Sequence, residues 1–393
     1  MNASFFISRR IRFKNGVVLA SIAVSYLVMI VAVAVSSGFR REIRDGLSFI
    51  SGDVRLTSPN LNVLDASRPI EKDASYMSYV MEAEGVAEVV PAVYRAGIVK
   101  QGDNIHGVLF KGVSKERFSS AADSMALAVS IPRRLSDISG LAVGDRMTTY
   151  FIGEKVRLRQ FNIVSVYDAL VEADDRLVVY ASIEDMQRLD GWTQQQVSAI
   201  EILLDRDHKD EWKIYEASQE IGAYVNAWSS ESDSPVVAQS SVSTYPQLFD
   251  WLNLIDFNVL FILILMTVVA GFNMISGVLI MLFENISTIG LLKALGMTDR
   301  AISKTFLASS AELVLKGMAI GNALAVLFCL IQGGTHLLKL DPTNYFVSFV
   351  PVHLNIGAVV LADIVSFAAI MLIMLLPTLF ISKVDPAQTV RMK

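Results

Sequence analysis

Four long apolar segments constrain this fold more than any other feature of the sequence. They cover residues 16–38, 255–283, 303–331 and 354–381. A helix needs about 20 apolar residues to cross the roughly 30 Å hydrocarbon core of a bilayer, and each segment is long enough. Inside lipid the backbone must satisfy its own hydrogen bonds, which favours helices. The sequence therefore predicts a membrane protein with four transmembrane α-helices, one before and three after a large polar region.

The segment before the first span, residues 1–15, is basic and amphipathic. Its sequence FFISRRIRFK sets aromatic residues against four cations, a pattern typical of a helix lying at the membrane surface. The alternative is the n-region of a signal peptide, because AVAVSSG offers a small-residue cleavage site. The apolar run is longer than a usual signal-peptide core and Arg40-Arg41 follows it, so a retained first span is favoured.

Charge predicts the orientation of the spans. The amino terminus, the connection between spans two and three and the carboxyl tail together carry a net charge of +7, although the whole chain carries −5. Short basic connections stay in the cytoplasm. Both termini are therefore expected inside, with the polar region between spans one and two outside. The cluster Arg40, Arg41 and Arg44 just outside the first span is discordant, and Glu42 and Asp45 partly offset it.

Residues 39–254 form a polar region large enough for one or two compact lobes. Strand-like alternation and helical stretches follow one another without a repeat, which predicts an α+β domain. Met147–Ile152 and Lys155–Tyr167 flank Gly153-Glu154 as in a hairpin. The stretch 129–141 is interpreted as helical. The Ser-rich stretch 229–243, with Pro235, is interpreted as a linker to the second span.

The polar region contains no recognisable catalytic or metal site. His106 and His208 stand alone, without a spacing that could hold a metal, and no nucleophile elbow or phosphate loop is present. The acidic stretch 168–175 has the composition of a cation site, but a solvated loop explains it as well. We therefore expect no catalytic residues, no metal and no nucleic-acid partner, and favour a role in binding other proteins.

Three ionisable residues fall inside the predicted spans. Charged side chains in lipid are costly and need a partner or a function. Glu312 and Lys316 are one helical turn apart, and Asp363 lies at a similar depth in the fourth span. We expect an intramembrane polar cluster of these three; water-facing carboxylates or a proton relay are alternatives. Asn273 is expected to bond a neighbouring helix, and Gly271 to allow close helix approach.

A short amphipathic segment connects the second and third spans. Residues 284–302 are too polar to span the bilayer, and their apolar residues recur every three to four positions. A short helix at the mouth of two membrane helices can act as a lever on both. The candidate contact residues of this lever are Glu284, Ile289, Gly290, Leu292, Lys293, Leu295, Gly296, Met297 and Arg300.

The chain resembles the FtsX/MacB/LolC permeases, the mechanotransmitting class of ABC transporters, over nearly its whole length. The most specific segment is AGFNMISGVLIMLFENISTIGLLKALGMTDRAISKTFL, which looks like the family's second span, coupling helix and start of the third span. SGFRREIRDGLSFISGDVRL, IPRRLSDISGLAVGDRM and the tail VDPAQTVRMK also match in order. LDPTNYFVSFVPV is similar to the outer loop of the lipoprotein-releasing LolC/LolE branch.

The resemblance implies a multi-pass protein of the bacterial inner membrane with both termini cytoplasmic. Its map would be 1–15 amphipathic segment, 16–38 first span, 39–254 periplasmic α+β domain, 255–283 second span, 284–302 coupling helix, 303–331 third span, 332–353 periplasmic loop, 354–381 fourth span and 382–393 cytoplasmic tail. No nucleotide-binding motif is present, so ATP and Mg would bind a partner LolD-like ATPase. The resemblance implies that this ATPase contacts the coupling helix through the nine candidate contact residues named above.

The resemblance also implies a second permease subunit, identical or different, a lipoprotein substrate drawn from membrane lipid, and a LolA-like periplasmic carrier. The apolar wall for the acyl chains is assigned to Val28, Val31, Val35, Phe257, Phe261 and Ile264. The hairpin around Tyr150–Arg159 is shorter than the hook with which LolC captures its carrier. The alternatives are a MacB-like efflux or export permease and an FtsX-like regulator of a cell-wall hydrolase.

Overall fold

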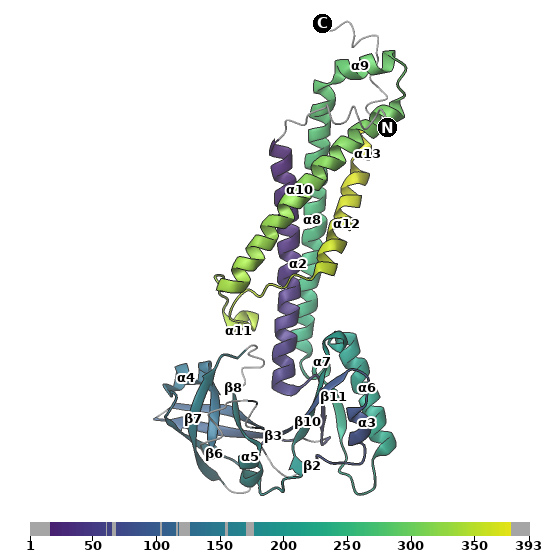
Figure 1. Ribbon diagram of the computed structural model, residues 1–393. Helices are drawn as coiled ribbons and strands as arrows, with labels where there is room; N and C mark the ends of the chain where they lie inside the picture. Colours follow the sequence, from purple (N-terminus) through teal and green to yellow (C-terminus); the bar gives the residue numbers. More distant parts are fainter. Residues whose placement is uncertain are drawn as a thin grey trace. The chain divides into compact units, whose positions relative to one another are not determined.

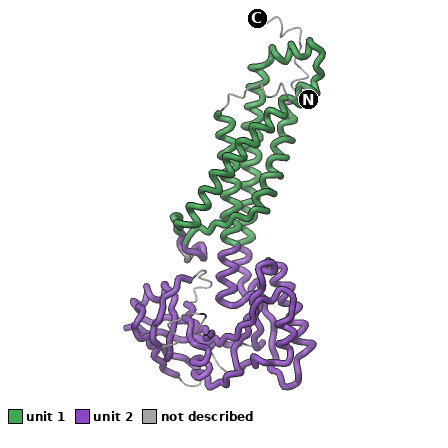
Figure 2. Tube along the Cα trace, viewed as in Figure 1, with its two compact units in different colours: residues 1–40, 252–339, 349–393 green, residues 41–251, 340–348 purple. Residues whose placement is uncertain are grey.

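The computed structural model describes residues 16–59, 61–64, 68–102, 104–114, 117, 126–153, 156–169 and 177–378. The predicted amphipathic segment 1–15, the tail 382–393 and residues 170–175 of the candidate cation site lie outside this part. The chain divides into two compact units, coloured in Figure 2. Unit 1 comprises Met1–Arg40, Leu252–Lys339 and Phe349–Lys393, and unit 2 comprises Arg41–Trp251 and Leu340–Ser348.

Unit 1 is a bundle of long helices. Within the described residues, four helices are long and apolar enough to cross a membrane, which confirms the prediction of one span followed by three. Two of them, α2 and α8, extend well beyond the predicted spans. The helices are α2 (Gly16–Ser51), α8 (Pro246–Glu284), α9 (Ile286–Ala294), α10 (Asp299–Thr335), α12 (Ile356–Ile373) and α13 (Leu375–Thr378) (Figure 1).

Small residues let the helices of unit 1 approach closely. A Cβ atom added at Gly321 of α10 would lie 2.5 Å from the carbonyl oxygen of Ala23 on α2, and one added at Gly317 would lie 2.5 Å from Ile22. Gly271 of α8 similarly faces Ile373 of α12, as the sequence predicted. Close backbone approach is the usual way in which helices gain packing contacts in lipid.

Unit 2 is an α+β unit built on a nine-stranded sheet with the order β11-β1-β10-β3-β4-β8-β5-β7-β6. A small second sheet pairs β2 with β9. The strands are β1 (Val54–Thr57), β2 (Ile70–Glu71), β3 (Val86–Gln101), β4 (Asn104–Val113), β5 (Ala128–Pro132), β6 (Arg146–Phe151), β7 (Arg157–Tyr167), β8 (Leu177–Ser182), β9 (Gln196–Val197), β10 (Ala199–Leu204) and β11 (Val237–Ser240) (Figure 1).

The 16-residue strand β3 connects the two halves of this sheet. Its first half pairs with β10, whereas its second half pairs with β4. Ile98 and Val99 of β3 also pair with Tyr150 and Thr149 of β6, so the sheet from β3 to β6 closes on itself. The closed part is filled by rings of Phe110, Phe151 and Phe161, whose centroids lie 4.9–6.1 Å apart.

Helices cover the sheet of unit 2. Apolar residues of α3 and α6 pack with those of β1 and β10 in the main core, which includes Met77, Ile214 and Ile221. The helices of unit 2 are α3 (Met77–Met81), α4 (Arg133–Ser139), α5 (Ile183–Asp190), the short helix η4 (Arg206–His208), α6 (Glu211–Trp228), α7 (Ser241–Thr244) and α11 (Pro342–Tyr345).

The α+β class predicted for the region between the first two spans is confirmed, but two local predictions were wrong. Residues 128–132 form strand β5, and the helix α4 begins only at Arg133, because Ala128–Pro132 is fully buried between β7 and β8. The stretch 229–243 is not a plain linker, since β11 pairs with β1 within it. The hairpin of β6 and β7 has the predicted strands, with residues 154–155 of its turn outside the described part.

Candidate functional site

The segment between α8 and α10 is a rigid helical turn. Helix α9 ends at Ala294, and Gly296, just after the C-cap Leu295, has a φ of +88°, a conformation that favours glycine. The amide of Gly296 donates to the carbonyl of Lys293 at 2.9 Å, and the amide of Met297 donates to that of Leu292 at 2.9 Å. This pair of bonds is the Schellman motif, which satisfies the last carbonyls of a helix. The ion pair of Lys293 and Asp299, at 2.9 Å, closes the turn.

The predicted ATPase-coupling residues divide into a buried and an exposed set. Ile289 is 1% exposed and packs with Met281 and Phe306, and Gly290 is buried beside it. Leu292 and Met297 are half-buried against the same cluster. Glu284, Gly296 and Arg300 are exposed, and Leu295 is 76% exposed. Ile289 and Gly290 therefore hold α9 in place. The exposed residues, and not these two, form the surface that a partner could contact.

Leu291 was missed by the sequence analysis. It is 56% exposed and lies one helical turn before Leu295, so the two side chains share one side of α9. Leu291 in the last turn of the nine-residue helix and Leu295 at its C-cap form an exposed apolar contact surface. The spacing of four residues to Leu295 was a signal that could have found it.

Polar side chains join α2 to α8 in unit 1. Asn273 donates to the hydroxyl of Ser21, as predicted for a residue that seeks a partner on another helix. Near the other end of the same pair of helices, Asp256 accepts from Ser36 and forms an ion pair with Arg40. These contacts fix the two helices as antiparallel neighbours at two levels.

The predicted cluster of three intramembrane charges is wrong in its third member. Lys316 pairs with Glu312 at 2.7 Å on α10, one helical turn apart. Asp363 of α12 instead accepts from the amide nitrogen of Asn322 at 2.6 Å. Asn322 lies farther along α10 than Lys316. Asp363 therefore lies at the depth of Asn322, and not at the depth of Lys316 as the sequence predicted. Two separate polar pairs replace the cluster.

The residues assigned to an acyl-chain wall lie at matching levels of α2 and α8. Phe257, Phe261 and Ile264 are more than half exposed on α8, and the three valines of α2 are half-buried. The contacts between Ser36 and Asp256 and between Met29 and Thr267 place both sets along the same stretch of the helix pair. Their contact with a lipid chain stays a prediction.

The carboxyl end of α2 is anchored in unit 2 by a buried ion pair. Lys111 of β4 lies 2.7 Å from Glu201 of β10, and both side chains are at most 2% exposed. The Lys111 ammonium also donates to the carbonyl oxygens of Phe49 and Ile50, at 2.9 and 2.8 Å, in the last turn of α2. A cation at this end satisfies free carbonyls and complements the helix dipole.

Tyr94 of β3 completes this anchor. Its hydroxyl donates to Glu201 and lies 3.2 Å from the carbonyl oxygen of Ile50. Burial raises the pKa of Tyr94 well above its ordinary value, with the Glu201 carboxylate adding to the rise. Burial lowers the pKa of Lys111, and the same carboxylate opposes that change. The hydroxyl therefore stays protonated and keeps donating.

A second contact holds the turn that follows α2. Asp53, only 2% exposed, accepts from the hydroxyl of Ser48 and from the amide of Leu204 at 2.8 Å. Lys209 lies 3.8 Å from the same carboxylate. Burial raises the pKa of Asp53, and these three partners partly counter the rise. Strand β1 starts at the next residue, so the helix end, the turn and the sheet form one bonded unit.

The sequence analysis named none of the anchor residues. Lys111 and Glu201 each stand as a lone charge within an apolar strand, FKGV and AIEILL, and that is the signal that could have found them. Their pairing depends on β3 lying between β4 and β10, which local patterns do not reveal. Within the described residues no group of acidic, histidine or cysteine side chains could hold a metal ion.

Comparison with known proteins identifies the helical part of the chain. Residues 260–386 match the family described as FtsX-like permease C-terminal. This stretch is similar to an FtsX-like permease domain. This stretch contains the coupling segment, α10 and α12, and the resemblance predicted from the sequence is confirmed. The FtsX-like permease domain and the four apolar helices make the chain a multi-pass membrane protein.

The chain is also similar to known proteins over nearly its whole length. It is 23% identical to the lipoprotein-releasing system transmembrane protein LolE of Haemophilus influenzae, covering 99% of both chains. It is 22% identical to the lipoprotein-releasing system transmembrane protein LolC of Neisseria meningitidis serogroup B, covering 95% of this chain and 92% of the relative. A solved periplasmic region of MacB from Actinobacillus actinomycetemcomitans overlaps 50% of this chain and 92% of its own, at 14% identity and a TM-score of 0.31.

Proposed function

We propose that this chain is the permease subunit of an ABC transporter that extracts lipoproteins from the bacterial inner membrane and passes them to a LolA-like periplasmic carrier. A separate LolD-like ATPase binds ATP and Mg, and a second permease subunit completes the complex. The observation that carries the proposal is the alignment with LolC and LolE relatives over 95–99% of the chain. In this assignment the chain has no catalytic residue of its own.

The coupling segment supports a mechanical role. Leu291 and Leu295 present an apolar surface, while Ile289 locks the helix onto the ends of α8 and α10. A force on the exposed leucines is therefore passed to two long helices rather than absorbed by a flexible loop. In unit 2 the hydrogen bonds from Lys111 hold the end of α2 to the sheet. We infer that ATP-driven movement enters through α9.

The energy of the task explains why a nucleotide would be needed. Each buried acyl CH₂ contributes about 0.8 kcal/mol to membrane anchoring, so two or three acyl chains are held by tens of kcal/mol. A single passive binding event does not supply that much.

The proposal also includes an orientation in the membrane. The basic connections favour cytoplasmic termini and a cytoplasmic α9, so unit 2 is taken to be periplasmic.

Depletion of the chain tests the proposal against its rivals. We expect mature lipoproteins to accumulate in the inner membrane fraction while their outer membrane pool falls. Drug sensitivity with normal lipoprotein sorting would favour a MacB-like efflux or export permease. Filamentous cells with normal sorting would favour an FtsX-like regulator of a cell-wall hydrolase. Either of the last two results would overturn the proposed function.

A variant of the exposed leucines tests the coupling surface. Leu295→Glu places a charge on a side chain that is 76% exposed, so the fold should tolerate it. We expect the variant to reach the membrane, lose co-purification with the ATPase and fail to release lipoproteins. The matched control is Leu158→Glu on β7, where the replaced leucine is 53% exposed and belongs to unit 2. Equal ATPase recovery with both variants would refute α9 as the contact.

A further inference from the structure

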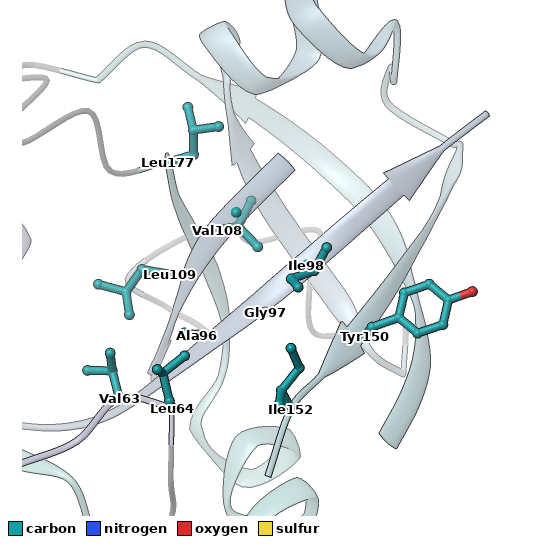
Figure 3. A pocket seen from close by; sticks show the side chains of 11 residues that line it. Val63, Leu64, Ala96, Gly97, Ile98, Val108, Leu109, Tyr150, Ile152 and Leu177 are labelled. Carbon is teal, nitrogen blue, oxygen red and sulfur yellow. The ribbon is translucent and has the colours of Figure 1, made fainter. Parts of the chain in front are cut away.

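Unit 2 contains an apolar hollow on one face of its sheet. Its volume is about 390 Å³, within the range of small-molecule sites. Figure 3 shows aliphatic side chains around it, and the hydroxyl of Tyr150 points away from them. Among the described residues that line it, none is charged: Val63, Leu64, Ala96, Gly97, Ile98, Gly107, Val108, Leu109, Tyr150, Ile152 and Leu177.

Alternating small and large residues create the hollow. Ala96 lies opposite Leu109 and Ile98 lies opposite Gly107 across β3 and β4. Cross-strand partners share one face of a sheet, so all four side-chain positions face the hollow. A Cβ atom built at Gly107 meets no atom within 4 Å, and the φ of Gly107 is not in the left-handed region. Gly107 therefore leaves open space in the hollow, and its backbone conformation does not require glycine.

The hollow continues the face on which α2 ends. Tyr94 and Lys111, which hold the carbonyls of Phe49 and Ile50, are the next cross-strand pair beyond Ala96 and Leu109. Two residues along a strand span about 7 Å. The apolar surface thus begins one row of side chains away from the end of the helix that carries the first candidate membrane span.

The chemistry of the hollow favours an unbranched hydrocarbon chain. Strands β3 and β4 are each paired on both sides, so a peptide could not add to them as a further strand. Its amide groups would find few partners in an aliphatic lining, which is costly. The nearby cation Lys111 is already bonded to Glu201 and to two carbonyls, so it is not placed to bind a lipid phosphate.

We propose that this hollow receives an acyl chain of the lipoprotein cargo after it leaves the membrane-spanning helices. The lipid-modified amino-terminal cysteine of a lipoprotein carries its acyl chains on uncharged ester and amide links, which matches a lining without charges. The proposal rests on the proposed function, because it takes the cargo to be a lipoprotein. It adds a transient site for one acyl chain in unit 2.

Photocrosslinking on the full chain in nanodiscs tests the proposal. The probe is a synthetic triacylated lipopeptide with a diazirine in one acyl chain, and adducts are mapped by mass spectrometry. We expect adducts in residues 96–109 and at Tyr150 or Ile152, in addition to adducts on the membrane helices. Adducts confined to the helices would overturn the proposal.

Filling the hollow provides the decisive variant. Gly107→Leu places about four carbons where no atom stands, and each displaced CH₂ lowers affinity about fourfold, so pocket adducts should fall on the order of a hundredfold. Gly107→Ala should give a fall of only about fourfold. Adducts near Phe261 and the thermal melting of the protein should stay unchanged in both variants. Pocket adducts that survive Gly107→Leu would refute the site.

Two further probes identify the occupant. A diazirine phospholipid that labels the hollow as well as the lipopeptide does would show a bilayer lipid there and refute the proposed source. An unacylated peptide that competes as well as the lipopeptide would show a peptide site and refute the acyl chain. If depletion strands lipoproteins in the inner membrane but the lipopeptide gives no adducts in the hollow, this inference alone is refuted. If lipoprotein sorting stays normal on depletion, the proposed function is refuted.

Discussion

Replacing Lys111 by methionine is the sharpest test of the anchored helix end. The side chain is buried and makes three charge-assisted contacts, to Glu201, Phe49 and Ile50. Methionine keeps the apolar stem and removes the ammonium. The Glu201 carboxylate then stays buried with the Tyr94 hydroxyl still donating to it, and the carbonyls of Phe49 and Ile50 lose the ammonium.

The magnitude follows from the burial. Removing one partner of a buried ion pair costs about 3–5 kcal/mol, because the other charge is left uncompensated. Since about 1.4 kcal/mol is a factor of ten, opening of the α2 end should become roughly a hundredfold or more easier. The double variant Lys111→Met/Glu201→Gln removes the unpaired charge. It should regain most of the melting temperature while the end of α2 stays loose, because its carbonyls still lack the ammonium.

Hydrogen exchange on the full chain in nanodiscs measures this opening. The reporting amides are Gly52, which donates to Ser48, and Asp53, which donates to the carbonyl of Ile202. The matched control is Lys100→Met on β3, where the lysine is exposed. If Lys111→Met and Lys100→Met left exchange at these amides equally slow, the anchor would carry no stability and the reasoning would be refuted.

Two further predictions concern the helices of unit 1. Gly321→Ala places a Cβ atom 2.5 Å from the α2 backbone and should lower the free energy of unfolding by about 1–3 kcal/mol. The control Gly334→Ala has open space and should lower it much less. Equal melting temperatures for the two variants would contradict the close packing of α10 on α2. Asn322→Leu removes the amide that donates to Asp363 at 2.6 Å and should lower the free energy of unfolding by about 1–3 kcal/mol. The double variant Asn322→Leu/Asp363→Leu should regain stability, because no buried carboxylate is then left without its donor. A double variant no more stable than the single one would contradict the pair.

The membrane-spanning helices could be predicted from local sequence patterns, because the backbone in lipid must satisfy its own hydrogen bonds. A run of apolar residues in hydrocarbon has little choice but to form a helix, so four spans and the coupling segment between two of them could be predicted from periodicity and length. The same holds for Asn273, since a lone amide in a membrane helix needs a partner nearby. The amphipathic pattern could not say that Ile289 points inward and Leu291 outward, because apolar residues occur on both sides of α9.

Long-range contacts decided the rest. Asp363 pairs with Asn322 and not with Lys316, because the register between α10 and α12 is set by packing along their whole length. Lys111 and Glu201 meet, 90 residues apart in the chain, only because β3 lies between their strands. The residues alone determined a chain of four membrane helices with an α+β unit between the first two. The tertiary structure alone determined the helix anchor and the apolar hollow, because both depend on strand order, which local sequence does not encode.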